Sequence, residues 1–158
     1  MNHKIIILLF AASVLIFSNL TEAQQAGKVF RIGFLDASTV SGMAGLVDAF
    51  QQELTKLGWI GGKNITIEYR FAEQKRERVP ELAADLVRLK VNLIVASGTP
   101  SAFAAKKATT TIPIVVANVG DPVGSDLVTS LARPGGNVTG LSGLAGELNT
   151  SQIYLKFF

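Results

Sequence analysis

Apolar runs alternate with amphipathic segments along most of the chain, and small or polar turns separate them. A short continuous apolar run is typical of a strand buried in a parallel sheet, whereas apolar residues three and four positions apart indicate one face of a helix. The runs predict four strands, at residues 29–35, 91–96, 112–117 and 138–141, and the alternating segment at residues 65–71 predicts a fifth strand with one wetter face. The amphipathic segments predict four helices, at residues 43–57, 81–90, 100–109 and 126–133.

This alternation predicts an α/β fold, a doubly wound parallel sheet of about five strands with helices on both faces. The order most often built this way places the first and third strands side by side. Ligands of such sheets bind at the carboxyl ends of the strands, where the winding reverses. Those ends fall after Asp36, Phe71, Ala96, Ala117 and Leu141.

The first 23 residues have the pattern of a signal peptide. A short positive start that includes Lys4 precedes an apolar run over residues 5–17. A membrane-spanning helix needs about 20 apolar residues, so this run is short for one. Small residues at Thr21 and Ala23 form a cleavage site. We therefore expect export to the periplasm with cleavage after Ala23; an uncleaved membrane anchor is the alternative.

The pattern changes again near the C-terminus. Residues 24–146 hold all the predicted strands and helices, so we expect them to form one ligand-binding lobe. In residues 147–158 a helical start is weakened by Asn149-Thr150-Ser151 and followed by exposed apolar residues. We interpret residues 147–158 as an aberrant or truncated tail.

The composition excludes several kinds of chemistry. The sequence has no cysteine, and its one histidine, His3, lies in the signal segment. Thiol nucleophiles, Ser-His-Asp triads and nearly all zinc or copper sites are thereby excluded from the mature chain. Neither a P-loop nor a dinucleotide-binding glycine motif occurs, so no metal or other cofactor is expected. The net charge is +3 and the basic residues are dispersed among acidic ones, so we expect no nucleic-acid binding.

Small residues follow the third predicted strand, at the start of a helix. Thr99 suits an N-cap and Pro100 the first helical position. The N–H groups of Ser101 and Ala102 would then be free to attract a carboxylate or phosphate. Alternatively, Thr99 only caps its own helix.

Acidic and hydroxyl side chains follow two other strands. Asp121 accepts hydrogen bonds and suits a ligand ammonium, or else it makes a turn before Pro122. Ser38 supplies a hydroxyl after the first strand, or else it only solubilises the loop. Asp36 and Asp121 both lie at strand ends, which leaves open an acid/base pair in a small enzyme.

Residues 24–148 closely resemble one protein family. The segments "LGWIGGKNITIEYR", "GTPSAFAAKKATTTIPIV" and "DPVGSDLVTSLARPGGNVTG" carry the resemblance, in this order. The family is that of ABC-transporter substrate-binding proteins of the periplasmic-binding-protein type I fold. In that family two similar Rossmann-like lobes flank a cleft, and the ligand lies between them. The resemblance implies that Ser38, Thr99, Ser101 and Asp121 line the cleft.

The resemblance also implies a role. The chain would be the periplasmic substrate-binding component of an ABC importer, taking up an amino acid or related small molecule. Its partners would be the permease and ATPase subunits, and only the permease would link it to the membrane. We expect a monomer. Family members continue into a second lobe, whereas "NTSQIYLKFF" ends this sequence, so we expect a fragment without that lobe.

Two other functions stay open. One is a small secreted α/β enzyme that uses Asp36 and Asp121. The other is a non-functional truncated remnant of a ligand-binding protein.

Overall fold

The computed structural model describes residues 29–130, 133 and 135–142. The expected signal peptide over residues 1–23 and the expected tail over residues 147–158 lie outside the described residues. No helix within the described ranges is long and apolar enough to cross a membrane.

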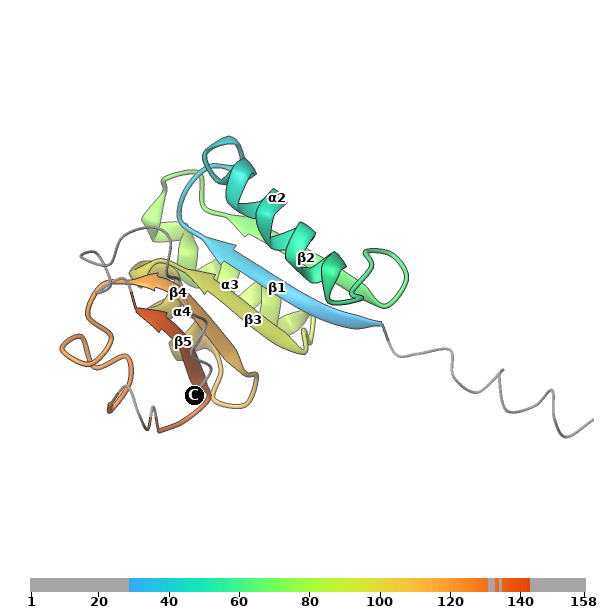
Figure 1. The fold of residues 1–158 in the computed structure, drawn as a ribbon. Coiled ribbons are helices and arrows are strands. Elements are labelled where there is room, and N and C mark those ends of the chain that lie inside the picture. The colour runs from blue at the N-terminus through green and yellow to red at the C-terminus, as the bar shows by residue number, and fades with distance from the viewer. Residues whose placement is uncertain (1–28, 131–132, 134, 143–158) are drawn as a thin grey trace, which may run out of the picture.

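Five parallel strands form one sheet in the order β2-β1-β3-β4-β5 (Figure 1). The strands are β1 (Phe30–Asp36), β2 (Ile65–Phe71), β3 (Leu93–Ser97), β4 (Ile114–Val119) and β5 (Val138–Ser142). The expected doubly wound sheet is thus confirmed, with the first and third strands side by side.

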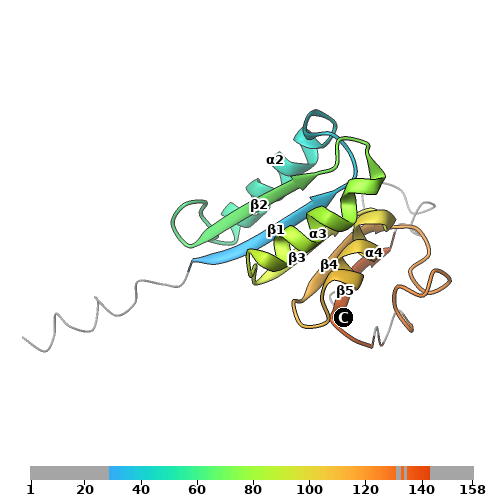
Figure 2. The same ribbon diagram turned by 180° about the vertical axis from the view of Figure 1, so that it is seen from behind.

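The helices lie on both faces of the sheet. α2 (Val40–Lys56) covers one face, and α3 (Val79–Arg88) and α4 (Thr99–Ala108) cover the other (Figures 1 and 2). A single 3₁₀ turn, η1 (Arg76–Arg78), leads into α3. Three of the four expected helices are therefore confirmed.

The expected helix over residues 126–133 is wrong. Its described residues form turns and bends, and residues 131–132 lie outside the described part of the chain. Asp126 has a φ of 58°, which no helical residue adopts. Leu127 and Val128 are nevertheless buried. The apolar pattern that suggested a helix therefore reflects a loop packed on the core.

The main core lies between the sheet and the pair α3–α4. Leu86 of α3 is 0% exposed, and its side chain fills the space that a Cβ on Gly33 of β1 would need. This close approach of helix to strand explains why glycine stands inside a buried strand. The core under α3 and α4 is continuous across the sheet to Val138 of β5.

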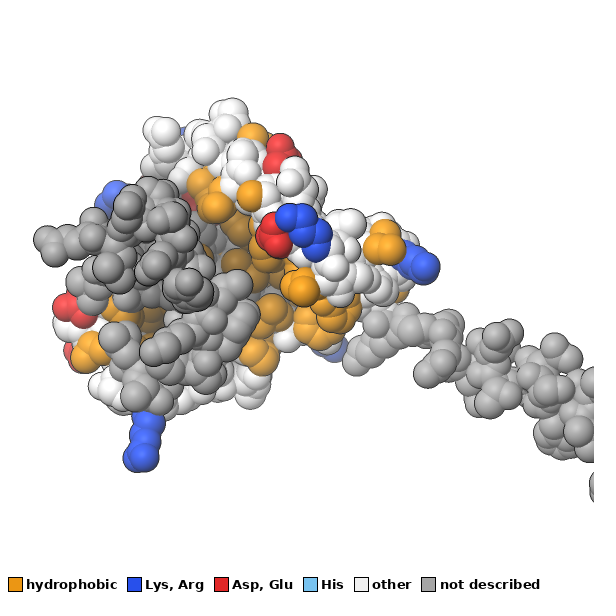
Figure 3. Space-filling model, in the orientation of Figure 1, with side chains coloured by type: hydrophobic (Ala, Val, Ile, Leu, Met, Phe, Trp, Pro, Cys, Tyr) orange, Lys and Arg blue, Asp and Glu red, His pale blue; other side chains and the backbone are white. Residues whose placement is uncertain are grey.

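The opposite core is smaller and aromatic. Phe34 of β1 lies between Phe50 of α2 and two rings of β2, Tyr69 and Phe71, with ring centroids 5.7 to 5.9 Å from its own. No residue of α2 is fully buried. Apolar side chains beside α2 are visible on the surface (Figure 3). α2 is therefore held by one narrow stripe of contacts.

Candidate ligand-binding site at the carboxyl edge of the sheet

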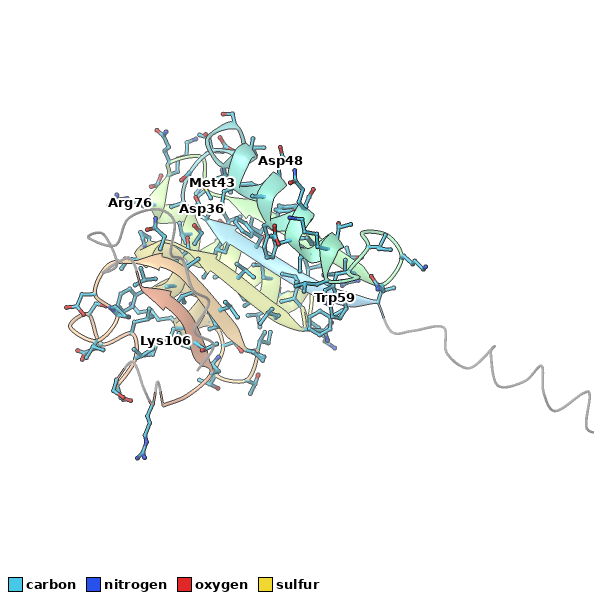
Figure 4. The ribbon with its side chains drawn as sticks, in the orientation of Figure 1. Asp36, Met43, Asp48, Trp59, Arg76 and Lys106 are labelled. Atoms are coloured by element: carbon cyan, nitrogen blue, oxygen red, sulfur yellow. The ribbon has the colours of Figure 1, made fainter. Side chains whose placement is uncertain are left out.

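The loops that follow the strands gather at the carboxyl edge of the sheet (Figure 1). The loops after β1 and β2 are joined by main-chain hydrogen bonds: Ala72 N–H donates to Asp36 O (3.0 Å), and Glu73 N–H donates to Ser38 O (3.1 Å). Asp36, Met43 and Arg76 also lie at this end of the sheet (Figure 4). This edge is where a doubly wound sheet offers a ligand site.

α4 begins at this edge without a side-chain cap. Its N-cap is Gly98, whose φ of 78° and ψ of 159° belong to a region that is essentially restricted to glycine. The expectation that Thr99 is the N-cap, with Pro100 first in the helix, is wrong by one residue, because α4 already begins at Thr99. Thr99 therefore makes no cap hydrogen bond, and the start of the helix is open.

Two N–H groups at the start of α4 have no acceptor within the helix. They belong to Thr99 and Ser101, since Pro100 has no N–H. The expected free N–H of Ala102 is wrong, because it donates to Gly98 O at 3.1 Å. The start of α4 thus offers the N–H of the half-buried Thr99 together with the positive end of the helix dipole, whereas the N–H of Ser101 belongs to a residue that is 0% exposed.

Ser101 itself is fully buried beneath this turn. The whole residue is 0% exposed, and its hydroxyl has no hydrogen-bond partner among the described residues. A buried hydroxyl without a partner costs about 1–3 kcal/mol. Ser101 therefore lies at the expected position, but its hydroxyl is not at the surface.

The start of α2 differs from that of α4 because acceptors already occupy it. The Thr39 hydroxyl accepts from Gly42 N–H at 3.1 Å, and Glu73 Oε1 accepts from Val40 N–H at 3.3 Å. A negative charge from the protein thus stands at the N-terminus of α2. Of these two helix starts at the edge, that of α4 is the one without a side-chain acceptor.

Both main-chain groups of Ser38, its N–H and its carbonyl, make hydrogen bonds. Asp36, which is 5% exposed, accepts from Ser38 N–H at 2.6 Å. On the other side, Ser38 O accepts from Glu73, which with Gln74 adopts the left-handed conformation (φ of 54° and 62°). Sequence reasoning missed this pair, because glutamate and glutamine carry no signal for a left-handed turn. The hydroxyl of Ser38 is half-buried at the edge.

Asp121 makes a turn after β4. Its Oδ1 accepts from Gly124 N–H at 2.8 Å, and its carbonyl accepts from Ser125 N–H at 3.1 Å. Asp121 therefore stabilises a turn, which was the alternative to binding a ligand ammonium. The side chain is exposed, and a carboxylate has further lone pairs to offer.

The residues considered for catalysis are engaged in loop structure. Asp36 and Asp121 each accept a main-chain N–H, and β3 separates the strands that precede them. No group of three or more histidine, cysteine, aspartate or glutamate residues in the described ranges is arranged to hold a metal ion. The arrangement at this edge suits binding through main-chain N–H groups, a hydroxyl and a carboxylate.

The sequence profile of one family, described as ABC transporter substrate binding protein, matches residues 37–156. A tyrosine-binding protein of Clostridioides difficile is 43% identical over 93 residues, which are 59% of this chain and 27% of that protein.

Two solved structures that are similar to this chain are a substrate-binding protein and an ABC domain. A ligand-free, open substrate-binding protein with adhesive properties from Clostridium difficile has 36% identity and a TM-score of 0.67, covering 72% of this chain and 39% of that one. An ABC domain in complex with L-Trp from Streptococcus pneumonia has 30% identity and a TM-score of 0.67, covering 73% and 39%. This chain thus spans well under half of either relative, with the fold of one lobe. With the profile matching most of its length, the chain belongs to the family of ABC transporter substrate-binding proteins.

Proposed function

We propose that this chain is the ligand-binding lobe of an exported receptor that delivers an amino acid, or a related small molecule, to the permease and ATPase of an ABC importer. The observation that carries the proposal is the open start of α4 at the carboxyl edge, beside an α2 start that Thr39 and Glu73 already occupy. The tyrosine-binding relative and the complex with L-Trp support an aromatic amino acid as the ligand.

In this proposal the ligand carboxylate accepts from the N–H of Thr99 at the start of α4, and Ser101 lies buried directly beneath it. The helix dipole adds about 0.3–1 kcal/mol at an exposed site, and up to about 2 kcal/mol when the site is partly buried. The ligand ammonium donates to Asp121, a charge-assisted hydrogen bond that strengthens when water is excluded. Ser38 lies at the same edge and offers its hydroxyl. Exclusion of water requires a second lobe over the cleft.

Export is part of the proposal. The segment before the lobe would be removed after Ala23, and the mature chain would act in the periplasm. The intact mass of the chain from a periplasmic fraction tests this step. A mass that retains residues 1–23, found in the membrane fraction, would contradict it.

Calorimetric titration tests the binding. This chain is titrated with L-tyrosine and L-tryptophan, alone and joined to the part of the tyrosine-binding relative that it does not cover. We expect the joined protein to bind at least one of them tightly, and this chain alone to bind at millimolar concentrations or not at all. A joined protein that folds but binds neither amino acid would contradict the proposal.

One substitution tests the role of Asp121 within the same experiment. Asp121→Asn keeps an oxygen for the N–H of Gly124 but removes the charge, so it should weaken binding to the joined protein by about 1.5–3 kcal/mol. Asp48→Asn is the matched control, because Asp48 is an exposed carboxylate on α2. If Asp121→Asn binds as tightly as its parent, Asp121 is only a turn residue.

A further inference from the structure

β2 is the outer strand at one side of the sheet, and only β1 pairs with it (Figure 2). Phe30 N–H donates to Asn64 O (2.9 Å) at one end of this pair, and Ala72 N–H donates to Asp36 O (3.0 Å) at the other. In a parallel ladder this register turns the main-chain groups of even-numbered β2 residues toward β1. The groups of the odd-numbered residues therefore point away from the sheet.

Part of this outer edge is covered. Ile65 N–H donates to Ile60 O (3.4 Å), and Ile65 O accepts from Gly62 N–H (3.0 Å). The outward groups of Ile67, Tyr69 and Phe71 have a single hydrogen bond among the described residues, from Arg70 Nη1 to Tyr69 O (2.9 Å). An edge with free N–H and C=O groups is a template for another strand.

Charges along β2 favour one particular partner, a second copy of the same strand. Glu68 and Arg70 lie on one face, and within the chain they are only loosely paired, at 3.9 Å. If a second β2 runs antiparallel with Tyr69 opposite Tyr69, each Glu68 lies opposite the Arg70 of the other copy. Opposite charges in directly facing positions stabilise a pair of strands, and like charges destabilise it. A pairing centred on Glu68 would instead set two glutamates against each other.

The hydrogen-bonding pattern agrees with this register. Antiparallel strands exchange their main-chain bonds at every second residue pair. With Tyr69 at the centre, those pairs are Tyr69 with Tyr69 and Ile67 with Phe71, the residues whose groups point outward. The Glu68–Arg70 pairs then fall at the positions between them, where side chains come closest.

An apolar groove runs along the same edge. It has a volume of about 400 Å³ and lies between α2 and β2, lined by Val40, Ala44, Val47, Asp48, Tyr69 and Phe71. Val40 is 58% exposed. A two-fold axis midway between the two Tyr69 residues, perpendicular to the sheet, would bring the grooves of two copies together. Each copy would then cover apolar surface on the other.

We propose that two copies of this chain associate through β2, in an antiparallel pair centred on Tyr69, which joins their sheets into one. This departs from the monomer expected from the sequence.

Sedimentation of the purified full-length chain tests the proposal. We expect twice the mass of one chain at micromolar concentrations. Glu68→Arg and Arg70→Glu each create like-charged pairs, so each should raise the dissociation constant about tenfold. The double substitution Glu68→Arg/Arg70→Glu restores the opposite charges and should restore the dimer.

A charge reversal elsewhere is the matched control. Glu53→Arg disrupts an exposed ion pair with Lys56 on α2 and should leave the mass unchanged. The proposal is overturned by a parent chain that stays monomeric at high micromolar concentration. It is also overturned if Glu68→Arg associates as tightly as the parent, or if the double substitution does not restore association. If the unsubstituted chain is monomeric, the outer edge of β2 faces solvent or binds another partner.

A disulfide test does not depend on the charged residues. The sequence has no cysteine, so a single introduced thiol is unique. Tyr69→Cys would place two thiols across the two-fold axis with Cα atoms about 5.5 Å apart, within reach of a disulfide. Thr66→Cys is the control, because the two copies of residue 66 would lie roughly 20 Å apart. We expect a disulfide-linked dimer from Tyr69→Cys alone; none from that variant, or equal amounts from both, would contradict the register.

Discussion

Single residues decide which helix start can accept a ligand. The small residues after β3 predicted a tight turn, and the structure has one there. The position of the cap was wrong, because sequence rules look for a side-chain oxygen and Gly98 has no side chain. The closed start of α2 was not predicted at all, since it depends on Glu73, which is distant in sequence. Local patterns locate such turns but do not show which N–H groups remain free.

Gly98 is the residue on which this turn depends most. Gly98→Ala places a side chain at a φ of 78° and ψ of 159°, which should lower the free energy of unfolding by about 1–3 kcal/mol. Urea denaturation of the chain measures the loss. Gly61→Ala is the control, because Gly61 has open space around it and no left-handed conformation. Equal stability of Gly98→Ala and its parent would show that the turn tolerates a side chain.

At the scale of elements, strands and long helices were predictable and the last short helix was not. Apolar runs mark the central strands β1, β3 and β4 because both faces of the sheet are covered there. The outer strand β2 is marked instead by alternation, with Glu68 and Arg70 on one face. α2 and α3 were recognisable from spacing, since each packs one apolar stripe on the sheet. The same spacing over residues 126–133 arose from a buried loop, where Asp126 has left-handed geometry. Periodicity reports burial, and local backbone geometry decides whether a helix forms.

The packing of α3 gives a prediction at this scale. Leu86→Ala removes a side chain that is 0% exposed and packs against Gly33, so the free energy of unfolding should fall by about 2–5 kcal/mol. Leu46→Ala on α2 is the control, because Leu46 is 52% exposed and its loss should change stability little. Thermal or urea unfolding compares the two. If both substitutions cost the same, the packing of α3 described above is wrong.

At the scale of the whole molecule, the carboxyl edge of the sheet, where we propose that the ligand binds, and the outer strand β2 differ in chemistry. The carboxyl edge collects the loops of Ser38, Thr99 and Asp121, as the strand order predicted. Ser101 lies buried beneath that edge, which no pattern in the sequence indicated. The free groups of β2 depend on the pairing register and became visible only in the structure. Sequence therefore predicted which loops meet at the carboxyl edge better than which of their atoms are exposed there.

In the proposed function, the open start of α4 receives the carboxylate of an amino acid. Titration of the joined protein with L-tyrosine and with tyramine tests it most directly, because tyramine has the same ring and ammonium group but no carboxylate. We predict that tyramine binds at least tenfold more weakly than L-tyrosine, since a charge-assisted hydrogen bond contributes about 1.5–3 kcal/mol. Equal affinity of the two ligands would contradict a carboxylate site at α4.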